Sequence, residues 1–548
     1  MNLNYRLFNR HSFFLLALSP LLFFSCNKVE LGAQPVLDSI YITNYMNSEP
    51  AFKDQLDWAK KFYRERSFQL GWFKNHEIVP QAGKLLEVIN RAEEEGLNPK
   101  DYQVVNFDEK FNQLKETKKS DTATIKALEK EIDVALSATY FNWASDYYRG
   151  LVVPRENRTV EWDVKRNKIK LHKALMTVLD ERESKYPYAE FQPLHPQYAN
   201  LKKALAYYRK VEAEGGWPQI PIGTKLKKGQ SSPVVPILRK RLREYLSEDT
   251  TASDVFDERL RSALMVFQES NGLRADGGIG PLTIQKLNMP VEQQIQKIII
   301  NMERWRWIPK SFEPDYLLVN IPEFRLHVFE KSKEVMNMKV IVGKEMNSTP
   351  IFSDKMEYVV LSPYWNVPPN ILREEIAPQV MANPSYLDAL DMEVITQKGD
   401  LVDPSTVDWS AAGQDGFPYI VRRRPGPQND LGGVKFIFPN TSNIYLHDTP
   451  NDELFNQVKR GFSHGCVRIE RPIDLAEYLL RNTSWTRSKI ESQISTRNEK
   501  FVPLKQKLPV YLVYFTATAD GNGRVSFYDD IYGHDRQLAS MYFNRVRQ

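Results

Sequence analysis

The hexapeptide Ser463-His464-Gly465-Cys466-Val467-Arg468 follows the tetrapeptide His447-Asp448-Thr449-Pro450 after a short loop. An apolar run, residues 443–447, leads to the histidine, and residues 466–469 have the composition of a second short strand. A helix pattern begins at Pro472. His447 and Cys466 are nineteen positions apart, at the edges of two predicted strands. This arrangement is typical of a cysteine nucleophile and its base, which are near in space and separated in sequence.

The chemistry of acyl transfer explains why these residue types occur together. A free thiol, with a pKa of ~8.5, is mostly protonated at neutral pH, and only the thiolate attacks a carbonyl. A neighbouring imidazole can take the thiol proton and return it to a leaving amine. Gly465 allows close backbone approach, so the N–H groups of Gly465 and Cys466 can hold an oxyanion, with His464 as a third donor.

Two alternative interpretations involve no catalysis. A lone cysteine is commonly a small buried apolar residue. Histidine and cysteine together can also bind zinc, but here two histidines and one cysteine have no second cysteine or carboxylate at ligand spacing. The glycine before the cysteine, between two strand patterns, favours the nucleophile. We therefore predict no metal ion and no organic cofactor.

The motif, with His447 before it, resembles the signature of the L,D-transpeptidases, cysteine enzymes that cross-link peptidoglycan. A longer set of segments is similar to the large multidomain murein L,D-transpeptidases of Gram-negative bacteria. These segments are Arg424-Pro425-Gly426-Pro427, Leu431-Gly432, Val434-Lys435-Phe436, Phe438-Pro439-Asn440 and Tyr445-Leu446-His447-Asp448-Thr449-Pro450. Related enzymes differ at the position of His464, so His447 is the predicted base.

The resemblance implies a reaction and a set of site residues. Cys466 would be the nucleophile, His447 the general base and acid, and Asp448 the residue whose backbone or side-chain oxygen orients His447. The further residues are Gly465 and His464 in the oxyanion hole, and Arg468, Tyr445, Trp365 and Ser463 in substrate binding. The reaction would join peptidoglycan peptide stems by 3→3 cross-links through a cysteine thioester, with release of D-alanine, and carbapenem β-lactams would inhibit it. The alternatives are an L,D-carboxypeptidase, a cysteine peptidase of other specificity, and a murein-binding lipoprotein with weak or no catalysis.

The composition is that of an exported globular protein. The 548 residues are 42% apolar, which is ample for two or three domains with their own cores. The net charge of +5 is small for this length and does not suggest a nucleic-acid partner.

The first 26 residues have the pattern of a targeting segment. Arg6 and Arg10 precede a mainly apolar run, residues 13–24, which is shorter than the ~20 residues that span a bilayer. Phe23-Phe24-Ser25-Cys26 resembles a lipobox, which predicts a lipid anchor at Cys26 and a periplasmic, membrane-anchored lipoprotein of a Gram-negative bacterium. A plain secretory signal and an uncleaved anchor are the alternatives. With Cys26 lipidated, Cys466 is the sole thiol of the mature protein.

Three units are predicted between the targeting segment and the catalytic region. Residues 35–215 have helical periodicity, and their aromatic stripe at Tyr140, Trp143 and Tyr147 favours core packing over sugar stacking. Residues 219–289 resemble a three-helix peptidoglycan-binding module, because the Phe-Gln, Asn-Gly-Leu, Asp-Gly and Gly-Pro-Leu-Thr pieces occur in that order. Residues 291–313 are predicted to form a helical connector.

Residues 314–537 are predicted to form the catalytic domain. Alternating strand patterns dominate and helices are few and short, and the family resemblance implies a β-rich domain with crossing sheets. Residues 370–425 interrupt the strands, begin with a helical pattern and then turn polar, and by resemblance form a capping insertion or lid. The predicted fold class is therefore multidomain α+β: a helical scaffold and a three-helix module, followed by a β-rich L,D-transpeptidase domain with a capping insertion.

Overall fold

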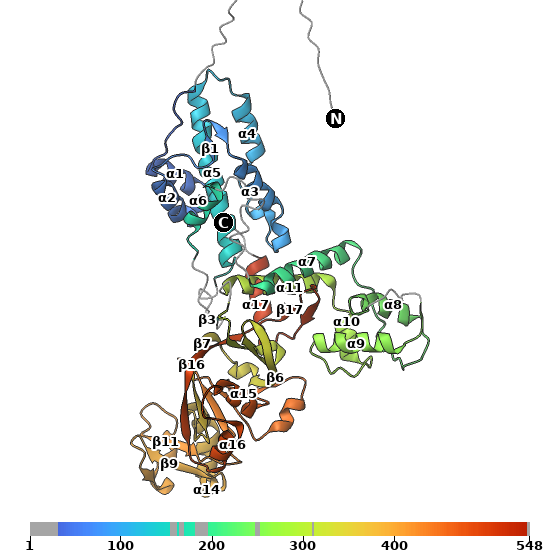
Figure 1. Ribbon diagram of the computed structural model, residues 1–548, viewed down its shortest axis with the longest axis vertical. Coiled ribbons are helices and arrows are strands. Elements are labelled where there is room, and N and C mark those ends of the chain that lie inside the picture. Colours follow the sequence, from blue (N-terminus) through green and yellow to red (C-terminus); the bar gives the residue numbers. More distant parts are fainter. Residues whose placement is uncertain are drawn as a thin grey trace, which may run out of the picture.

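The computed structural model describes residues 31–153, 162–163, 169–180, 195–246, 253–308 and 312–544. A helical region, a β-rich body and a small lobe follow one another along the long axis, and a three-helix module projects to one side (Figure 1). This arrangement confirms the predicted α+β multidomain architecture. The predicted targeting segment and lipobox lie outside the described residues. No helix within the described ranges is both long and apolar enough to cross a bilayer.

The helical region is built around one long, buried helix. Its helices are α1 (Ser39–Ser48), α2 (Leu56–Glu65), α3 (Pro80–Asn90), α4 (Phe107–Glu116), α5 (Thr122–Arg149), α6 (Leu171–Asp180) and α7 (Pro196–Ala213). The Asp121 carboxylate caps α5, which ends where Gly150 takes a positive φ of 84°. Tyr140, Trp143 and Tyr147 on α5 are 0%, 1% and 4% exposed, so the aromatic stripe packs in the core.

In the three-helix module, hydrogen bonds of one side chain explain why several of its sequence motifs occur in a fixed order. It consists of α8 (Val234–Arg241), α9 (Glu258–Ser270) and α10 (Pro281–Leu287), with a hydrophobic core of its own. The Gln268 amide at the end of α9 is 1% exposed and donates to Asp276 Oδ1, Gly278 O and Thr283 Oγ1, and it accepts from Gly277 N–H. One buried side chain therefore holds the turn and the start of α10 together.

The β-rich body is a sheet that closes on itself. Its strands are β4 (Tyr316–Asn320), β5 (Arg325–Glu330), β6 (Lys333–Gly343), β7 (Ile351–Leu361), β12 (Val434–Ile437), β13 (Leu446–His447), β15 (Val467–Ile469) and β16 (Lys500–Val513). The order β12-β13-β15-β6-β5-β4-β16-β7 returns to β12, because β12 pairs with both β13 and β7. We had expected crossing sheets; instead the strands form one ring.

One face of the ring is apolar along β12, β13 and β15. Phe436, Leu446 and Val467 are register partners and are each 0% exposed. Because successive side chains of a strand point to opposite faces, Lys435, His447 and Arg468 share the other face. Behind β15, the chain continues into α15 (Pro472–Leu479) and α16 (Arg487–Ser495).

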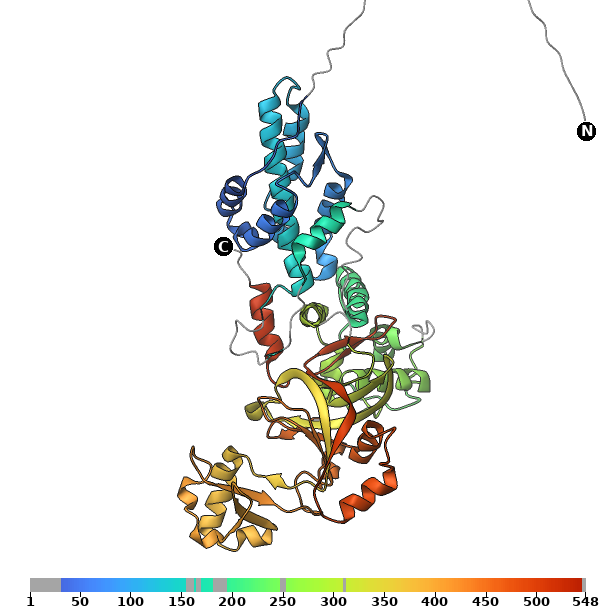
Figure 2. The same ribbon diagram turned by 60° about the vertical axis from the view of Figure 1, so that its left-hand side comes forward.

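The segment that follows β7 forms a lobe with its own core and sheet. Figure 2 shows this lobe beside the ring. Its elements are β8 (Trp365–Asn366), α12 (Pro369–Ile371), a π-helical turn (Leu372–Ile376), α13 (Ala377–Ala382), α14 (Tyr386–Ala389), β9 (Met392–Thr396), β10 (Leu401–Val402) and β11 (Tyr419–Arg423). The helical opening was predicted, but the sheet β10-β9-β11-β8 was not. Its strands are short and carry charges that pair internally, as Arg422 and Glu393 do at 2.6 Å.

Helix α11 (Val291–Trp307) is more than a linker, because it packs against the helical region and against the C-terminal part of the chain. It packs against α7, α5, α17 (His534–Phe543) and the hairpin of β17 (Ala517–Ala519) and β18 (Val525–Phe527). Trp305 stacks between Phe515, with 4.1 Å between the ring centroids, and His195, at 4.4 Å. The buried Asn301 amide accepts from Thr516 N–H at 2.9 Å and donates to Thr516 Oγ1 at 2.9 Å.

We predict that Asn301→Ala destabilises the junction between α11 and the β-rich body. The substitution leaves the Thr516 N–H buried without its acceptor, at a cost of about 1–3 kcal/mol. Thermal unfolding followed by circular dichroism should show a clearly lower midpoint. Asn522→Ala, in the exposed turn between β17 and β18, is the matched control and should leave the midpoint nearly unchanged. Equal midpoints for the two variants would contradict this account.

Candidate active site

The strand register places Cys466 and His447 on the same face of the sheet. Strands β13 and β15 are parallel, with Leu446 opposite Val467 and His447 opposite Arg468. The Val467 N–H donates to Tyr445 O at 3.2 Å, so the hydrogen bonds between the two strands extend to the residue before β13. Cys466 therefore lies beside Tyr445 and diagonally from His447, within the range over which diagonal side chains on adjacent strands interact.

A backbone carbonyl holds the His447 ring. His447 is 5% exposed, and its Nδ1 lies 2.6 Å from Asp448 O. A carbonyl only accepts, so Nδ1 carries the proton in the neutral ring and Nε2 is left as the proton acceptor. Of the two oxygens considered for Asp448, the structure therefore assigns the backbone one. The Asp448 carboxylate instead accepts from the N–H groups of Gly433 and Thr449, each at 2.7 Å.

Burial keeps this imidazole neutral. It lowers the pKa of His447 from 6.5 to about 3, and the nearby charges of Arg468 and Lys435 act in the same direction. At ~1.36 kcal/mol per pKa unit, this shift corresponds to about 5 kcal/mol against protonation. A stable thiolate–imidazolium pair is therefore disfavoured before substrate binds.

The Cys466 thiol is free and sits in a partly enclosed position. Its sulfur donates weakly to Asn443 O at 3.9 Å, and Tyr445 is the neighbour of Cys466 across the two strands. Burial raises the pKa of the thiol above its ordinary value, while Tyr445, Lys435 and Arg468 oppose the rise. The resting site thus combines a protonated thiol with a neutral base.

A network of hydroxyl groups fixes the loop before Cys466. Ser463 Oγ donates to Cys466 O at 2.5 Å and accepts from Gly465 N–H at 3.1 Å. Thr349 Oγ1 donates to Gly465 O at 2.8 Å and accepts from Gly343 N–H at 2.9 Å. Gly465 has a φ of 115°, which a residue with a side chain rarely adopts.

This network revises two predicted roles. The Gly465 amide, predicted as an oxyanion donor, is used inside the loop by Ser463. Ser463, predicted to contact substrate, is 2% exposed, and both of its hydrogen bonds lie within the loop. Among the hydrogen bonds of the described residues, none uses the Cys466 N–H, so this amide is the one available for an oxyanion.

Arg468 is partly buried, and one of its donors is unpaired. Its Nε is enclosed without a hydrogen-bond partner in the described part of the chain. Asp430 attracts it electrostatically, but the Asp430 carboxylate bonds to Arg423. An unpaired buried donor beside the thiol is a suitable position for an anionic group of a ligand.

The other predicted residues contact the lobe. His464 Nε2 lies 2.9 Å from Glu375 Oε1 on the π-helical turn, so the cysteine loop and the lobe touch directly. Trp365, on β8, packs on the core of the lobe and lies 5.6 Å from the Arg423 guanidinium. No contact that the structure gives for Trp365 reaches Cys466.

Sequence reasoning missed Lys435, Thr349 and Glu375. Lys435 had a signal, because alternation along residues 434–437 puts it on the face opposite to Val434 and Phe436. Thr349 and Glu375 had none, since their contacts depend on how distant segments fold onto the loop. Across the described ranges, no group of three or more His, Cys, Asp or Glu side chains is arranged to hold a metal ion.

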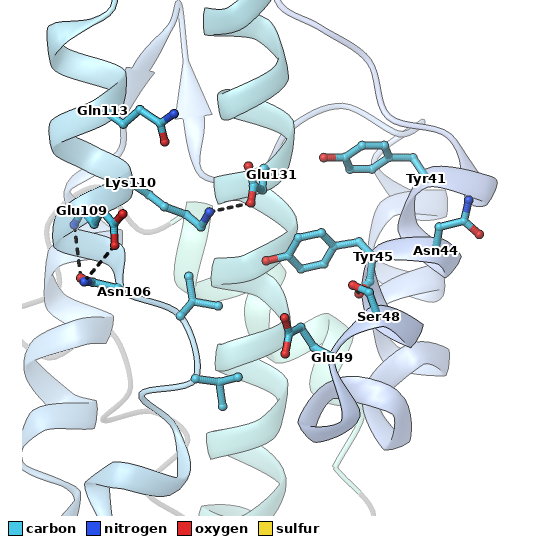
Figure 3. Close-up of a pocket in the computed structure, with 12 residues that line it drawn as sticks. Tyr41, Asn44, Tyr45, Ser48, Glu49, Asn106, Glu109, Lys110, Gln113 and Glu131 are labelled. Carbon is cyan, nitrogen blue, oxygen red and sulfur yellow. Dashed lines mark hydrogen bonds and ion pairs between the residues drawn. The ribbon is translucent and has the colours of Figure 1, made fainter. Parts of the chain in front are cut away.

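A cavity of about 650 Å³ lies far from this site, between α1, α4 and α5. Tyr41 and Tyr45 face it from one side, and the Lys110–Glu131 ion pair, 2.6 Å long, bridges α4 and α5 on the other (Figure 3). Its lining contains no histidine or cysteine, so we assign it no part in the chemistry.

Three family models match parts of the chain. Residues 314–491 match the model described as "L,D-transpeptidase catalytic domain". Residues 231–287 match a "Putative peptidoglycan binding domain", which coincides with the three-helix module, and residues 57–205 match a "Scaffold domain".

Individual relatives carry the same family name. The chain is 36% identical over 261 residues to a "Putative L,D-transpeptidase" of Haemophilus influenzae; the match covers 47% of this chain and spans about half, 52%, of the relative. Two solved structures are L,D-transpeptidases. That of Xylanimonas cellulosilytica has 15% identity, covers 54% of this chain and 99% of its own, and has a TM-score of 0.18. That of Stackebrandtia nassauensis has 13% identity, covers 54% of this chain and 96% of its own, and has a TM-score of 0.21.

We predict that the alkylation rate of Cys466 does not level off at acidic pH. A neutral base with a pKa of about 3 and a thiol with a raised pKa give a reaction rate that rises about tenfold per pH unit from pH 6 to 8. The measurement is the second-order rate with iodoacetamide, read from the mass of the Cys466 peptide. His447→Gln should retain the same slope. A plateau near pH 5 that disappears in His447→Gln would reveal a resting ion pair and contradict the prediction.

Proposed function

We propose that this protein is a peptidoglycan L,D-transpeptidase. Its donor is a tetrapeptide stem with a diamino acid at the third position and a terminal D-alanine. The observation that carries the proposal is the placement of Cys466 and His447 on one sheet face, with the His447 tautomer set by Asp448 O. The L,D-transpeptidase domain match over residues 314–491 supports it.

The reaction has two acyl-transfer steps. The Cys466 sulfur attacks the carbonyl carbon of the third stem residue, and His447 Nε2 takes the thiol proton. As the tetrahedral intermediate collapses, the C–N bond breaks, and His447 gives that proton to the departing D-alanine amine. The side-chain amine of a second stem then attacks the thioester and regenerates the thiol, which gives a 3→3 cross-link.

Two groups beside the sulfur can bind the negative charges of this reaction, which are the oxyanion and a carboxylate of the stem. The Cys466 N–H points to no other acceptor among the described residues, so it donates to the oxyanion. The Arg468 guanidinium, with its unpaired Nε, binds a carboxylate of the stem. Tyr445 lies beside Cys466 on the same face and therefore helps to position the nucleophile.

The lobe acts as a lid in this proposal. Glu375 of its π-helical turn holds His464 next to the cysteine, so the lobe covers one side of the reaction centre. A lid excludes water, which otherwise competes with the acceptor amine and turns transfer into L,D-carboxypeptidase hydrolysis. The His464–Glu375 contact is the observation in favour of transfer.

The setting of the reaction is proposed from the lipobox-like segment at Cys26 and from the three-helix module. We propose a periplasmic lipoprotein anchored at Cys26, with the three-helix module binding peptidoglycan near the catalytic domain. The match of residues 231–287 to the peptidoglycan-binding model supports this role of the module.

Purified tetrapeptide muropeptides provide the first test. The wild-type protein should release D-alanine and form dimers with 3→3 links, measured by liquid chromatography and mass spectrometry. Cys466→Ala should abolish both products, and His447→Gln should reduce kcat by at least about 100-fold with the fold intact. D-alanine release without dimers would establish a carboxypeptidase, and no product with a folded wild-type protein would favour a murein-binding role.

A carbapenem provides the second test, through covalent chemistry alone. The strained lactam carbonyl should acylate Cys466, so that the intact mass increases by that of one drug molecule. Cys466→Ala should show no increase. An unmodified wild-type protein, or an equal adduct on Cys466→Ala, would oppose the proposed nucleophile.

A further inference from the structure

Lys435 is a charged side chain beside the nucleophile that the reaction described above does not use. It lies on β12 directly opposite His447, so its side chain shares the face that carries Tyr445 and Cys466. Its Nζ is 3.8 Å from the centroid of the Tyr445 ring, a cation–π contact. Tyr445 in turn lies beside Cys466 on the same face, since the Val467 N–H donates to Tyr445 O. Ammonium, phenol ring and sulfur are therefore adjacent in that order.

The surroundings of Lys435 do not neutralise its charge. No carboxylate in the described residues lies within ion-pairing distance of its Nζ. Burial lowers the pKa of Lys435, so the fold holds this cation against a desolvation cost. The groups that raise the pKa of Lys435 are Cys466 and, more weakly, Glu499 before β16.

The other charged groups around the sulfur leave an excess of positive charge. Tyr445, just before β13, and His447, on β13, face it, and both are neutral at physiological pH because burial raises the pKa of the phenol and lowers that of the imidazole. Arg468 faces it from β15. Asp430, in the loop before β12, is the nearby acid, and its carboxylate is bonded to Arg423 and lies near Glu375 of the lobe.

We propose that Lys435 is a positioning residue for the nucleophile: its ammonium, held on the Tyr445 ring, stabilises negative charge on the Cys466 sulfur while the thiol proton moves to His447. Arg468 remains the group that binds the stem carboxylate, so the two cations have separate tasks. The kinetic consequence rests on the proposed transpeptidase function, but the effect on the thiol does not.

The expected size of the effect is the general one for an opposite charge beside an acid. An opposite charge within ~4–6 Å lowers an acid's pKa by about 1–3 units, and partial exposure brings this toward the lower end. Lys435→Met keeps the length of the side chain and removes the charge. It should raise the pKa of Cys466 by about one unit, and so slow alkylation at pH 7.5 by about tenfold.

The test is the alkylation rate of Cys466 in the full-length chain between pH 6 and 9. Iodoacetamide is uncharged, so the lost lysine cannot alter its approach by steering. Lys435→Met should shift the line of log rate against pH by about one unit to higher pH, while Lys435→Arg should stay close to wild type. Lys500→Met, an exposed lysine on β16, is the matched control and should not shift it. With tetrapeptide stems, kcat at pH 7.5 should fall about tenfold in Lys435→Met, with KM little changed.

An unshifted alkylation profile in a folded Lys435→Met would overturn the proposal, as would an equal shift in Lys500→Met. A loss seen only in KM would make Lys435 a substrate-binding residue and also overturn it. If Lys435→Met does not fold, Lys435→Gln is judged by the same criteria. The alkylation experiment needs no peptidoglycan. If the wild-type protein forms no cross-links, that result counts against the proposed function. The alkylation rates of Cys466 still decide the role of Lys435.

Discussion

The pairing register of β13 with β15 is the constraint on which the site depends. Leu446 and Val467 face the core and are fully buried, so their neighbours His447 and Arg468 must share the opposite face. A slip of one residue in either strand would turn its reactive side chain to the core and bring its apolar partner out. Burial of the apolar side chains supplies the free energy that fixes the register. The candidate catalytic side chains lie on the opposite face of the same strands.

Closure of the ring adds precision to this arrangement. Strand β12 pairs with β7, which closes the ring, and also with β13. The two-residue strand β13 is thus held between the longer strands β12 and β15. The turn that follows it is equally constrained. Gly432 has a φ of 58°, and a Cβ there would lie 2.3 Å from Asp448 Cγ. The Asp448 backbone, which orients the His447 ring, is thus fixed by packing of its own carboxylate.

Sequence patterns predicted the elements better than their connections. The order of motifs around Gln268 identified the three-helix module, and its amide bonds to the Asp-Gly piece and to Thr283 of the Gly-Pro-Leu-Thr piece. The strand expected over residues 443–447 was wrong, since it is confined to Leu446–His447. Asn440 holds Ile444 in a turn through bonds to both its N–H and its C=O, and Asn443 has a φ of 53°. Asparagine in a turn of this kind leaves no trace in hydrophobic periodicity.

The candidate site shows the same limit. Cys466 and His447 could be proposed as a pair from the sequence because a cysteine nucleophile and its base have defined residue types, and the structure places them on one sheet face. The use of the Gly465 amide by Ser463, and the contact between His464 and Glu375, depend on loop geometry that no spacing rule predicts. Lys435 was quoted as part of a motif, but its place on the Tyr445 ring required the register of three strands.

A crystal structure of the protein with Cys466 acylated by a stem peptide or a carbapenem would test the central claim most directly. We expect His447 Nε2 within about 4 Å of the acylated sulfur or the thioester carbonyl, with Nδ1 still bonded to Asp448 O and the β13–β15 register unchanged. A ring turned away from the thioester, or a register shifted by one residue, would show that the sheet does not assemble the nucleophile and its base.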